Sequence, residues 1–405
     1  MKRILSGIIG ACAAVAVFSG QASAMSAELG LRQVEQYNFS IHIMAMLLVG
    51  FGFLMVFVKK YGYSATTGTY LVVGTGIPLY LALRSWGGLS AEPVAADSVK
   101  SLLLAEFACA AALIAMGAVL GRLRLYQYAL LAMVIVPAYA LNEWLVLDGG
   151  LGATQGFVDG AGSIVIHAFG AYFGLGLSIA VTSRAHRGKA IDADETSDRF
   201  SMLGSMVLWL FWPSFCSAVV PAADTARTVI NTVLALCGST LSTYVASSLL
   251  RKGRTSFADM ANAALAGGVA IGATCNLLGP GSAFLVGLVA GALCVVGYAI
   301  IQPRLERSCK VVDSCGVHNL HGMPGLLGGL VAALAVPGIA SAQLIGIAFT
   351  VVLAFASGTA GGYLIRVTGS KSEAYQDQDE FLGCTSEGPA TPEPALGTIG
   401  EPESA

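Results

Sequence analysis

The sequence is poor in charge: Asp, Glu, Lys and Arg make up only 11% of its 405 residues, against about 25% in a typical soluble domain. A net charge of −2 provides no basic face, so nucleic acid is not an expected partner. A GxxxxGK[ST] motif is absent. The nine cysteines include no CxxC pair, which argues against a zinc site or a disulfide framework. We therefore expect neither an enzyme nor a bound metal or cofactor.

Apolar residues dominate instead, at 55% of the chain with a mean hydropathy of +0.73. A bilayer core of about 30 Å requires about 20 apolar residues in one helix. Segments of this kind fall at 38–58, 65–86, 98–121, 125–147, 161–182, 200–221, 226–250, 258–277, 281–302, 317–337 and 341–366. We predict an all-α polytopic membrane protein with about eleven transmembrane helices in the lipid bilayer.

Both ends of the chain differ from this apolar body. Lys2 and Arg3 precede an apolar run, and Ala22-Ser23-Ala24 resembles a cleavage site, so residues 1–24 are predicted to be a signal peptide. An uncleaved first helix is the alternative. The transmembrane domain would then span 25–366. Residues 367–405 are polar and rich in Pro, Glu, Ser and Gly, which predicts a cytoplasmic tail that is disordered or loosely docked.

Basic residues lie mainly in alternate loops and in the tail. They are Lys59, Lys60, Arg122, Arg124, Arg184, Arg187, Lys189, Arg199, Arg251, Lys252, Arg254, Arg304, Arg307, Lys310, Arg366 and Lys371. The opposite loops hold Arg32, Arg84, Lys100 and Arg227. Because cytoplasmic loops carry the excess of Lys and Arg, the N-terminus is predicted outside and the C-terminus in the cytoplasm.

An internal repeat is visible in two acidic residues, each eight positions before a histidine. Asp159 precedes His167 at the outer start of the fifth segment, and Asp313 precedes His321 at the inner start of the tenth. Equal spacing with opposite sidedness predicts a 5+5 inverted-topology repeat, an arrangement in which the transport site commonly lies near the midplane.

The two histidines are the strongest candidates for chemistry, because ionisable groups inside a membrane are costly and usually functional. If the repeat halves face each other, His167 and His321 meet near the midplane. A neutral imidazole carries one donor and one acceptor. Two that share a proton would offer hydrogen bonds to a small polar solute without a fixed charge. The alternative is two unrelated structural histidines.

The other histidines have simpler interpretations. His318 could line the inner part of a pore or hold the start of its helix. His42 is predicted to be structural. His186 lies in a charged loop and is expected to be solvated.

The acidic residues allow two interpretations each. Asp159 and Asp313 open helices, where a carboxylate can accept hydrogen bonds from free N–H groups. Asp159 could also attract cations to an outer vestibule. Glu106 lies inside the third segment and could border that vestibule or satisfy a packing role.

An aromatic run from Trp209 to Phe215 surrounds Pro213 in the sixth segment. A proline removes a helix hydrogen bond, and such breaks are tolerated beside cavities. Phe107 and Phe215 could stack across a pore and close it to water; ordinary packing is the alternative.

These features occur within motifs of a known family. The motifs are VGFGFLM (49–55), KKYG (59–62), IHAFGAYFG (166–174), LWLFWPSF (208–215), NAALAGGVA (262–270) and CGVHNLHGMPG (315–325). The chain resembles the Amt/Mep/Rh superfamily of ammonium transporters over about 38–366, and specifically its Rh branch, as a bacterial Rh protein of the inner membrane.

The resemblance implies a homotrimer with one ammonia-conducting pore in each subunit. By resemblance, the twin histidines are His167 and His321, the conserved acid is Asp159, and the outer gate is Phe107 with Phe215. Apolar pore positions would include Ile114 and Val317.

The chain departs from the Amt pattern at the outer mouth, where Amt proteins bind ammonium with a tryptophan and a serine. Leu147 and Val219 occupy these positions, and neither offers a π face or a hydroxyl. A tight ammonium site is therefore not expected.

The resulting hypothesis is a channel that conducts ammonia after ammonium loses its proton, with methylammonium as a further possible solute. A carbon dioxide channel, an electrogenic ammonium transporter and an ammonium sensor remain open. The tail contains no recognisable signalling domain and indicates no partner.

Overall fold

The computed structural model describes residues 30–87, 89, 98–385 and 388–389. The predicted signal peptide and residues 390–405 lie outside this part. Nine helices in the described part are long and apolar enough to cross a membrane. They are Gly30–Phe57, which includes α2 (Gly52–Leu54), Gly62–Trp86 (α3), Val99–Ala118 (α4), Gln127–Val146 (α5), Ser163–Val181 (with α6, Phe169–Val181), Glu195–Ser217 (α7), Ala222–Leu250 (with α8, Thr225–Leu250), Pro280–Cys309 (with α11, Pro280–Val296, and α12, Gln302–Cys309) and Ala340–Val367 (α14).

The other two predicted spans are irregular. One is divided into α9 (Phe257–Ala263), α10 (Ala266–Ile271) and a 3₁₀ turn (Gly272–Thr274), so the expectation of one continuous helix over 258–277 is wrong. The other begins with a π-helical segment, His318–Gly322, and continues as α13 (Met323–Ala335). Helix breaks at membrane depth are tolerated where protein or a cavity covers the backbone. The predicted all-α fold of eleven helices is confirmed with this correction.

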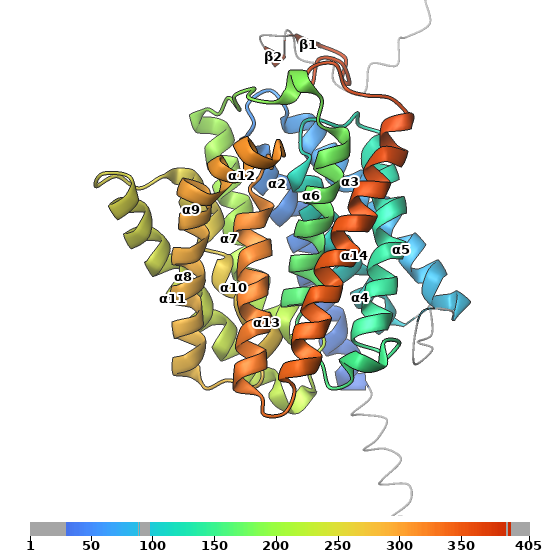
Figure 1. Cartoon of the computed structure of the whole chain (residues 1–405), viewed down its shortest axis with the longest axis vertical. Helices are drawn as coiled ribbons and strands as arrows, with labels where there is room; N and C mark the ends of the chain where they lie inside the picture. The colour runs from blue at the N-terminus through green and yellow to red at the C-terminus, as the bar shows by residue number, and fades with distance from the viewer. Residues whose placement is uncertain (1–29, 88, 90–97, 386–387, 390–405) are drawn as a thin grey trace, which may run out of the picture.

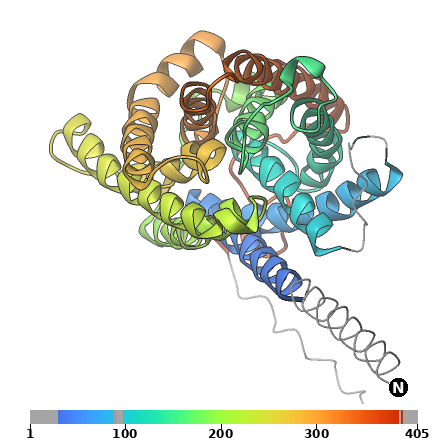
Figure 2. The ribbon, with the colours of Figure 1, turned by 90° about the horizontal axis from the view of Figure 1, so that it is seen from below.

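The described helices form a bundle with the short strands β1 (Cys384–Thr385) and β2 (Gly388–Pro389) at one end, while the turn between α13 and α14 lies at the other end (Figure 1). Viewed along the bundle, α8 and α11 lie on one side and α3 and α5 on the other (Figure 2). We call the end that carries β1 and β2 the inner end and the opposite end the outer end.

Two helix pairs approach closely through glycines. A Cβ atom added at Gly176 of α6 would lie 2.3 Å from the carbonyl oxygen of Phe355 in α14, and one added at Gly287 of α11 would lie 2.0 Å from that of Ala235 in α8. Only a residue without a side chain permits such contact between backbones, which is how small residues support helix packing in membranes.

The predicted repeat is visible as two matching helix starts. The Asp159 carboxylate accepts hydrogen bonds from the backbone N–H groups of Ile164 and Val165, at 3.0 and 2.8 Å. The Asp313 carboxylate accepts from those of Val317 and His318, at 2.9 and 3.0 Å. Each cap precedes a π-helical segment, Ser163–Ala168 or His318–Gly322, and then a helix of 13 residues, α6 or α13.

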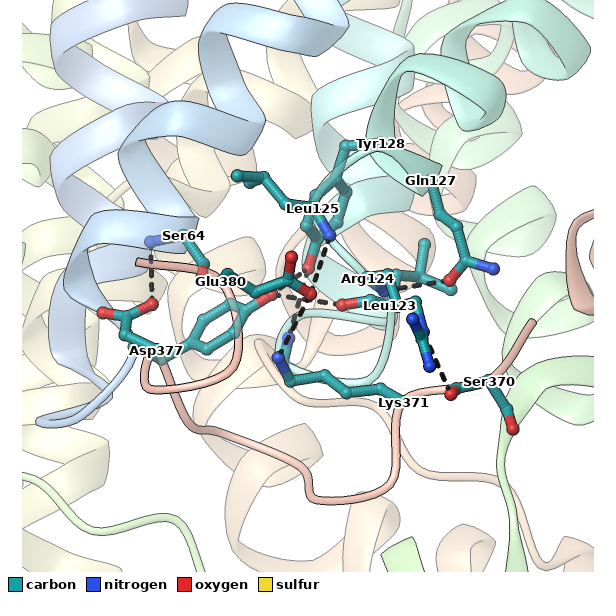
Figure 3. A network of polar contacts seen from close by, with 12 residues as sticks. Ser64, Leu123, Arg124, Leu125, Gln127, Tyr128, Ser370, Lys371, Asp377 and Glu380 are labelled. Atoms are coloured by element: carbon teal, nitrogen blue, oxygen red, sulfur yellow. Dashed lines mark hydrogen bonds and ion pairs between the residues drawn. The ribbon is translucent and has the colours of Figure 1, made fainter. Parts of the chain in front are cut away.

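The described part of the tail is docked by specific contacts rather than loosely (Figure 3). The Asp377 carboxylate accepts from the backbone N–H groups of Tyr63 and Ser64 at the start of α3, at 3.0 and 2.9 Å. Glu380 accepts from the backbone N–H of Leu125 and lies 3.6 Å from the ammonium of Lys371. The side chain of Lys371 is almost completely buried, so the tail covers part of the inner end.

The expectation that His186 is solvated is wrong. Its side chain is 2% exposed, and its Nε2 lies 3.1 Å from the carbonyl oxygen of Lys371. The docked tail covers the loop that contains this histidine, which loop charge alone could not reveal.

Candidate functional site: a paired-histidine pore

The two histidines of the repeat lie together, as their spacing predicted. The Nδ1 atoms of His167 and His321 are 3.2 Å apart, and the ring planes differ by only 11°. Both rings are buried. Because one Nδ1 must donate when the other accepts, the two imidazoles take complementary tautomers when both are neutral.

Aromatic rings cover the histidine pair. Trp212 stacks on His167 with ring centroids 5.6 Å apart, and Phe51 lies against His321 at 6.3 Å. The helix α7 continues through Pro213, so the proline does not open the pore wall here. A buried, mostly apolar surround disfavours a charged imidazole, which favours the neutral pair.

Phe107 and Phe215 are in contact on the outer side of this pair. Their centroids are 4.7 Å apart, but the rings meet at 70°, edge to face rather than stacked. Phe215 also lies 5.9 Å from the ring of His167. Since both side chains are buried, they separate His167 from the outer end of the molecule.

The outer end contains a cavity of about 860 Å³, the outer cavity, which reaches Phe107. Its charged lining residues are Arg84, Lys100, Glu143, Asp148 and Asp159. Arg84 lies 3.8 Å from Glu143 and 3.7 Å from Asp148. Tyr80 donates a 2.5 Å hydrogen bond to the carboxylate of Glu143. Acidic groups in this wall favour the approach of a small cation.

Leu147 and Val219 line the same outer cavity, and each is 40% exposed. Their position agrees with the assignment of both residues to the outer mouth. Neither side chain can hold a cation by π contact or hydroxyl, so this part of the wall is apolar.

On the inner side of the histidine pair lies a much smaller space of about 20 Å³, the inner chamber. The residues around it are Phe51, Leu54, Met55, Phe57, Leu113, Ile114, Gly117, Asn262, Cys315, Val317, Leu320 and His321. Ile114 and Val317 are thus located where a pore lining was expected. A chamber of this size accommodates about one water-sized molecule.

Three of the predicted site residues, Asp159, Glu106 and His318, form hydrogen bonds within the protein. Asp159 lines the outer cavity and also caps its helix. Glu106 is fully buried, is absent from the lining of the outer cavity, and accepts a 2.6 Å hydrogen bond from Ser40 through Oε1, while its Oε2 has no partner among the described residues. His318 is absent from the lining of the inner chamber. Its backbone N–H reaches Asp313, and its ring lies 5.7 Å from that of Tyr172.

Sequence reasoning missed Glu143 and Trp212. Glu143 was detectable as an acid inside an apolar segment, where a carboxylate is costly. Trp212 was part of the aromatic run, but spacing could not show which ring of that run stacks on His167. His42, predicted to be structural, lies 2.8 Å from the Ser214 hydroxyl through its Nδ1 atom.

With this geometry described, comparison with known proteins is informative. A model of the Ammonium Transporter Family matches residues 7–381. The chain belongs to this family. It is 38% identical to rabbit (Oryctolagus cuniculus) ammonium transporter Rh type B over 370 residues, which cover 82% of this chain and 80% of the relative. The mouse (Mus musculus) protein of the same name is also 38% identical, over 84% and 80% of the two chains.

Solved structures agree with the Rh branch that the sequence motifs indicated. Rh50 of Nitrosomonas europaea, described as one of the Rhesus protein family of channels, is 62% identical with a TM-score of 0.87, over 88% of this chain and 94% of that one. Mep2 of Candida albicans is 18% identical with a TM-score of 0.67, over 81% and 82%, and shows the shared fold only. The family comprises transporters and channels, as predicted, and not enzymes.

Proposed function

We propose that this Rh-family protein is an ammonia channel in which ammonium loses its proton at the outer cavity and NH₃ crosses past His167 and His321. The observation that carries the proposal is the hydrogen-bonded histidine pair, which lies between a wide charged cavity and a narrow apolar chamber. Family membership supports ammonia or ammonium as the solute.

Free energies favour NH₃ as the species that crosses. Ammonium has a pKa of about 9, so losing its proton at pH 7 costs roughly 3 kcal/mol. Transferring a bare cation into an apolar medium costs tens of kcal/mol in the idealised limit. Deprotonation is the cheaper route, and it excludes potassium because that ion has no proton to lose.

The histidine pair suits a neutral solute. When one Nδ1 donates to the other, one ring keeps a bare Nε2 acceptor and the other keeps an Nε2–H donor. The Nε2 of His167 has no hydrogen-bond partner among the described residues. Ammonia both donates and accepts, so it can donate to the bare Nε2 and accept from the Nε2–H of the other ring. Ammonium has no lone pair and could only donate.

The surroundings of the pore are also part of this proposal. We place the protein in the bacterial inner membrane as a homotrimer, with its outer cavity outside the cell and its docked tail in the cytoplasm. The signal peptide at 1–24, the transmembrane domain at 25–366 and the tail at 367–405 are part of the same proposal. Basic loops at the inner end support the orientation.

The test is solute flux into vesicles that contain the purified protein. Ammonium chloride added outside the vesicles should raise the internal pH faster than in protein-free vesicles, because entering NH₃ binds protons inside. No sustained membrane current should accompany this change. Methylammonium and carbon dioxide are measured in the same preparation. A sustained current would contradict the neutral-solute mechanism and indicate electrogenic transport. Flux of carbon dioxide alone would indicate a gas channel, and absence of any flux would favour a sensor.

A further inference from the structure

Asn262 is an unusual residue in the wall of the inner chamber. Of the described residues that line it, only Asn262 and His321 carry a nitrogen or oxygen atom in the side chain. The remaining wall is apolar, apart from the weakly polar sulfur of Cys315. A polar side chain within a membrane-spanning region is costly unless it has a partner or a role.

The helix break determines how this amide is oriented. Asn262 lies in the last turn of α9, and the backbone N–H of Leu265 reaches its carbonyl oxygen at 3.0 Å across the break. Asn262 is half-buried, and its side-chain Nδ2 donates a 2.9 Å hydrogen bond to the carbonyl oxygen of Ala258 on the exposed side of α9. Because a carbonyl oxygen can only accept, the amide must direct its NH₂ group there. The Oδ1 atom is therefore the end of the amide left for another partner.

We propose that Asn262 is the hydrogen-bond acceptor that ammonia meets when it leaves His321 for the inner end. This proposal rests on the proposed function. The chamber of about 20 Å³ holds about one small molecule, so a solute there has few hydrogen-bond partners other than His321 and Asn262. An N–H of ammonia can donate to Oδ1, which offsets part of the solute's loss of water.

An amide suits this position better than a carboxylate. Its oxygen accepts from NH₃ and also from NH₄⁺ once the solute regains a proton at the inner end. A carboxylate would also accept from ammonia, but its charge would attract the cation where water is scarce, so Asn262→Asp should conduct less than the wild type and more than a variant without an acceptor. A neutral acceptor thus assists the exit of ammonia without retaining ammonium.

The competing interpretation is that Asn262 only stabilises the break between α9 and α10 through its bond to Ala258. Two substitutions separate these roles. Asn262→Leu removes both the acceptor and the donor, whereas Asn262→Asp keeps the acceptor and removes the NH₂ donor. Thr359→Val is a matched control, because the Thr359 hydroxyl makes the same kind of bond to the carbonyl four residues earlier, in an exposed part of α14.

The experiment measures ammonia flux and melting temperature for these three variants in the vesicles described above. Loss of one hydrogen bond to the solute should lower the flux of Asn262→Leu about two- to tenfold, with an unchanged melting temperature. Asn262→Asp should exceed Asn262→Leu in flux, and Thr359→Val should match the wild type.

Two results would overturn the proposal. One is an Asn262→Leu flux equal to that of the wild type. The other is an equal fall in flux for the Leu and Asp variants, which would assign the residue to the helix break. If the wild type itself passes no ammonia, the proposed function fails, and that result is distinguishable from both.

Discussion

The two ends of the pore differ far more than the two histidines between them. His167 and His321 follow equivalent aspartate caps and equivalent π-helical segments. Yet the outer cavity measures about 860 Å³ with charged walls, and the inner chamber about 20 Å³ with apolar walls. The repeat thus positions the pair symmetrically, while the side chains that line each space differ between the two ends.

The difference in size and polarity between the outer cavity and the inner chamber fits a solute that enters charged and crosses neutral. The outer cavity is wide enough for a hydrated cation, and its wall holds the carboxylates of Glu143, Asp148 and Asp159 against the two cations Arg84 and Lys100. A narrow apolar space favours the neutral form. The largest effects are therefore expected where a substitution changes the narrow end.

Filling the inner chamber should abolish ammonia flux. A Cβ atom added at Gly117 would lie 3.0 Å from Val317 Cγ1 and 3.3 Å from Cys315 Cβ, so Gly117→Leu leaves no space for a solute. Flux should fall to that of protein-free vesicles, and Gly117→Ala should give an intermediate loss. Gly74→Leu is the matched control, because nothing lies within 4 Å of the added atom at that exposed helical position. Wild-type flux in a folded Gly117→Leu protein would show that the solute takes another path.

Removing one gate ring should join the outer cavity to the histidine pair. Phe107→Ala is expected to speed labelling of a cysteine introduced at Ile114 by an impermeant thiol reagent added outside. Truncating a tightly packed core phenylalanine costs about 3–5 kcal/mol, and a plug beside a cavity should cost less. Phe200→Ala, in a half-exposed ring at the other end, should leave labelling unchanged. Equal labelling rates in all three proteins would mean that Phe107 only packs.

The fold and the histidine pair could be predicted from sequence because they depend on simple periodic signals. Apolar length predicted the spans, and the equal spacing from Asp159 to His167 and from Asp313 to His321 predicted the pair. The break after Ala263 was not predictable in this way, since NAALAGGVA is uniformly apolar and small beyond its asparagine. Periodic signals also could not single out Asn262, because its position in the wall of the inner chamber depends on contacts between distant segments.

Contacts between distant segments were also beyond sequence reasoning. Ring orientation at Phe107 and Phe215 depends on how α4 and α7 pack. The resemblance implied a stacked gate, whereas the two rings meet edge to face. The sequence left a vestibule role and a packing role open for Glu106, and it could not show that Ser40, 66 positions away, donates to its carboxylate. His186 is buried by the docked tail, whose composition predicted a disordered or loosely docked segment and could not show these contacts.

A cation-binding group restored at the outer mouth should tighten apparent affinity. Leu147→Trp with Val219→Ser adds a π face and a hydroxyl to the cavity wall. A cation–π contact contributes about 0.5–2 kcal/mol, so the half-saturating ammonium concentration should fall roughly two- to thirtyfold. Leu334→Trp is the control, since Leu334 is 89% exposed and absent from the cavity lining. Micromolar saturation of the wild type would contradict the idea of a weak outer site.

The smallest expected effect concerns the tail that covers the inner end. Burial lowers the pKa of His186, and Arg122 and Lys189 lower it further, although its bonds to the backbone at Lys371 and Ser372 act in the opposite direction. Its Nδ1 atom is buried without a partner among the described residues, so an added proton there has no acceptor. Between the ordinary histidine pKa of about 6.5 and its lowered pKa in the folded protein, the unfolded chain binds more of this proton than the folded chain does.

The free energy of unfolding should therefore fall as the pH falls from 7.5 to 5.5, by at most about 1.4 kcal/mol per pH unit from this residue. His186→Gln keeps a donor for the Lys371 carbonyl but cannot titrate, so its melting temperature should depend less on pH. Other histidines contribute equally to both proteins, so the difference between the two slopes isolates His186. The range stays above pH 5.5 because burial raises the pKa of Asp377, which contributes with the opposite sign as that carboxyl titrates. Identical slopes would show that His186 is protonated without penalty, and that the tail releases this loop before the rest of the protein unfolds.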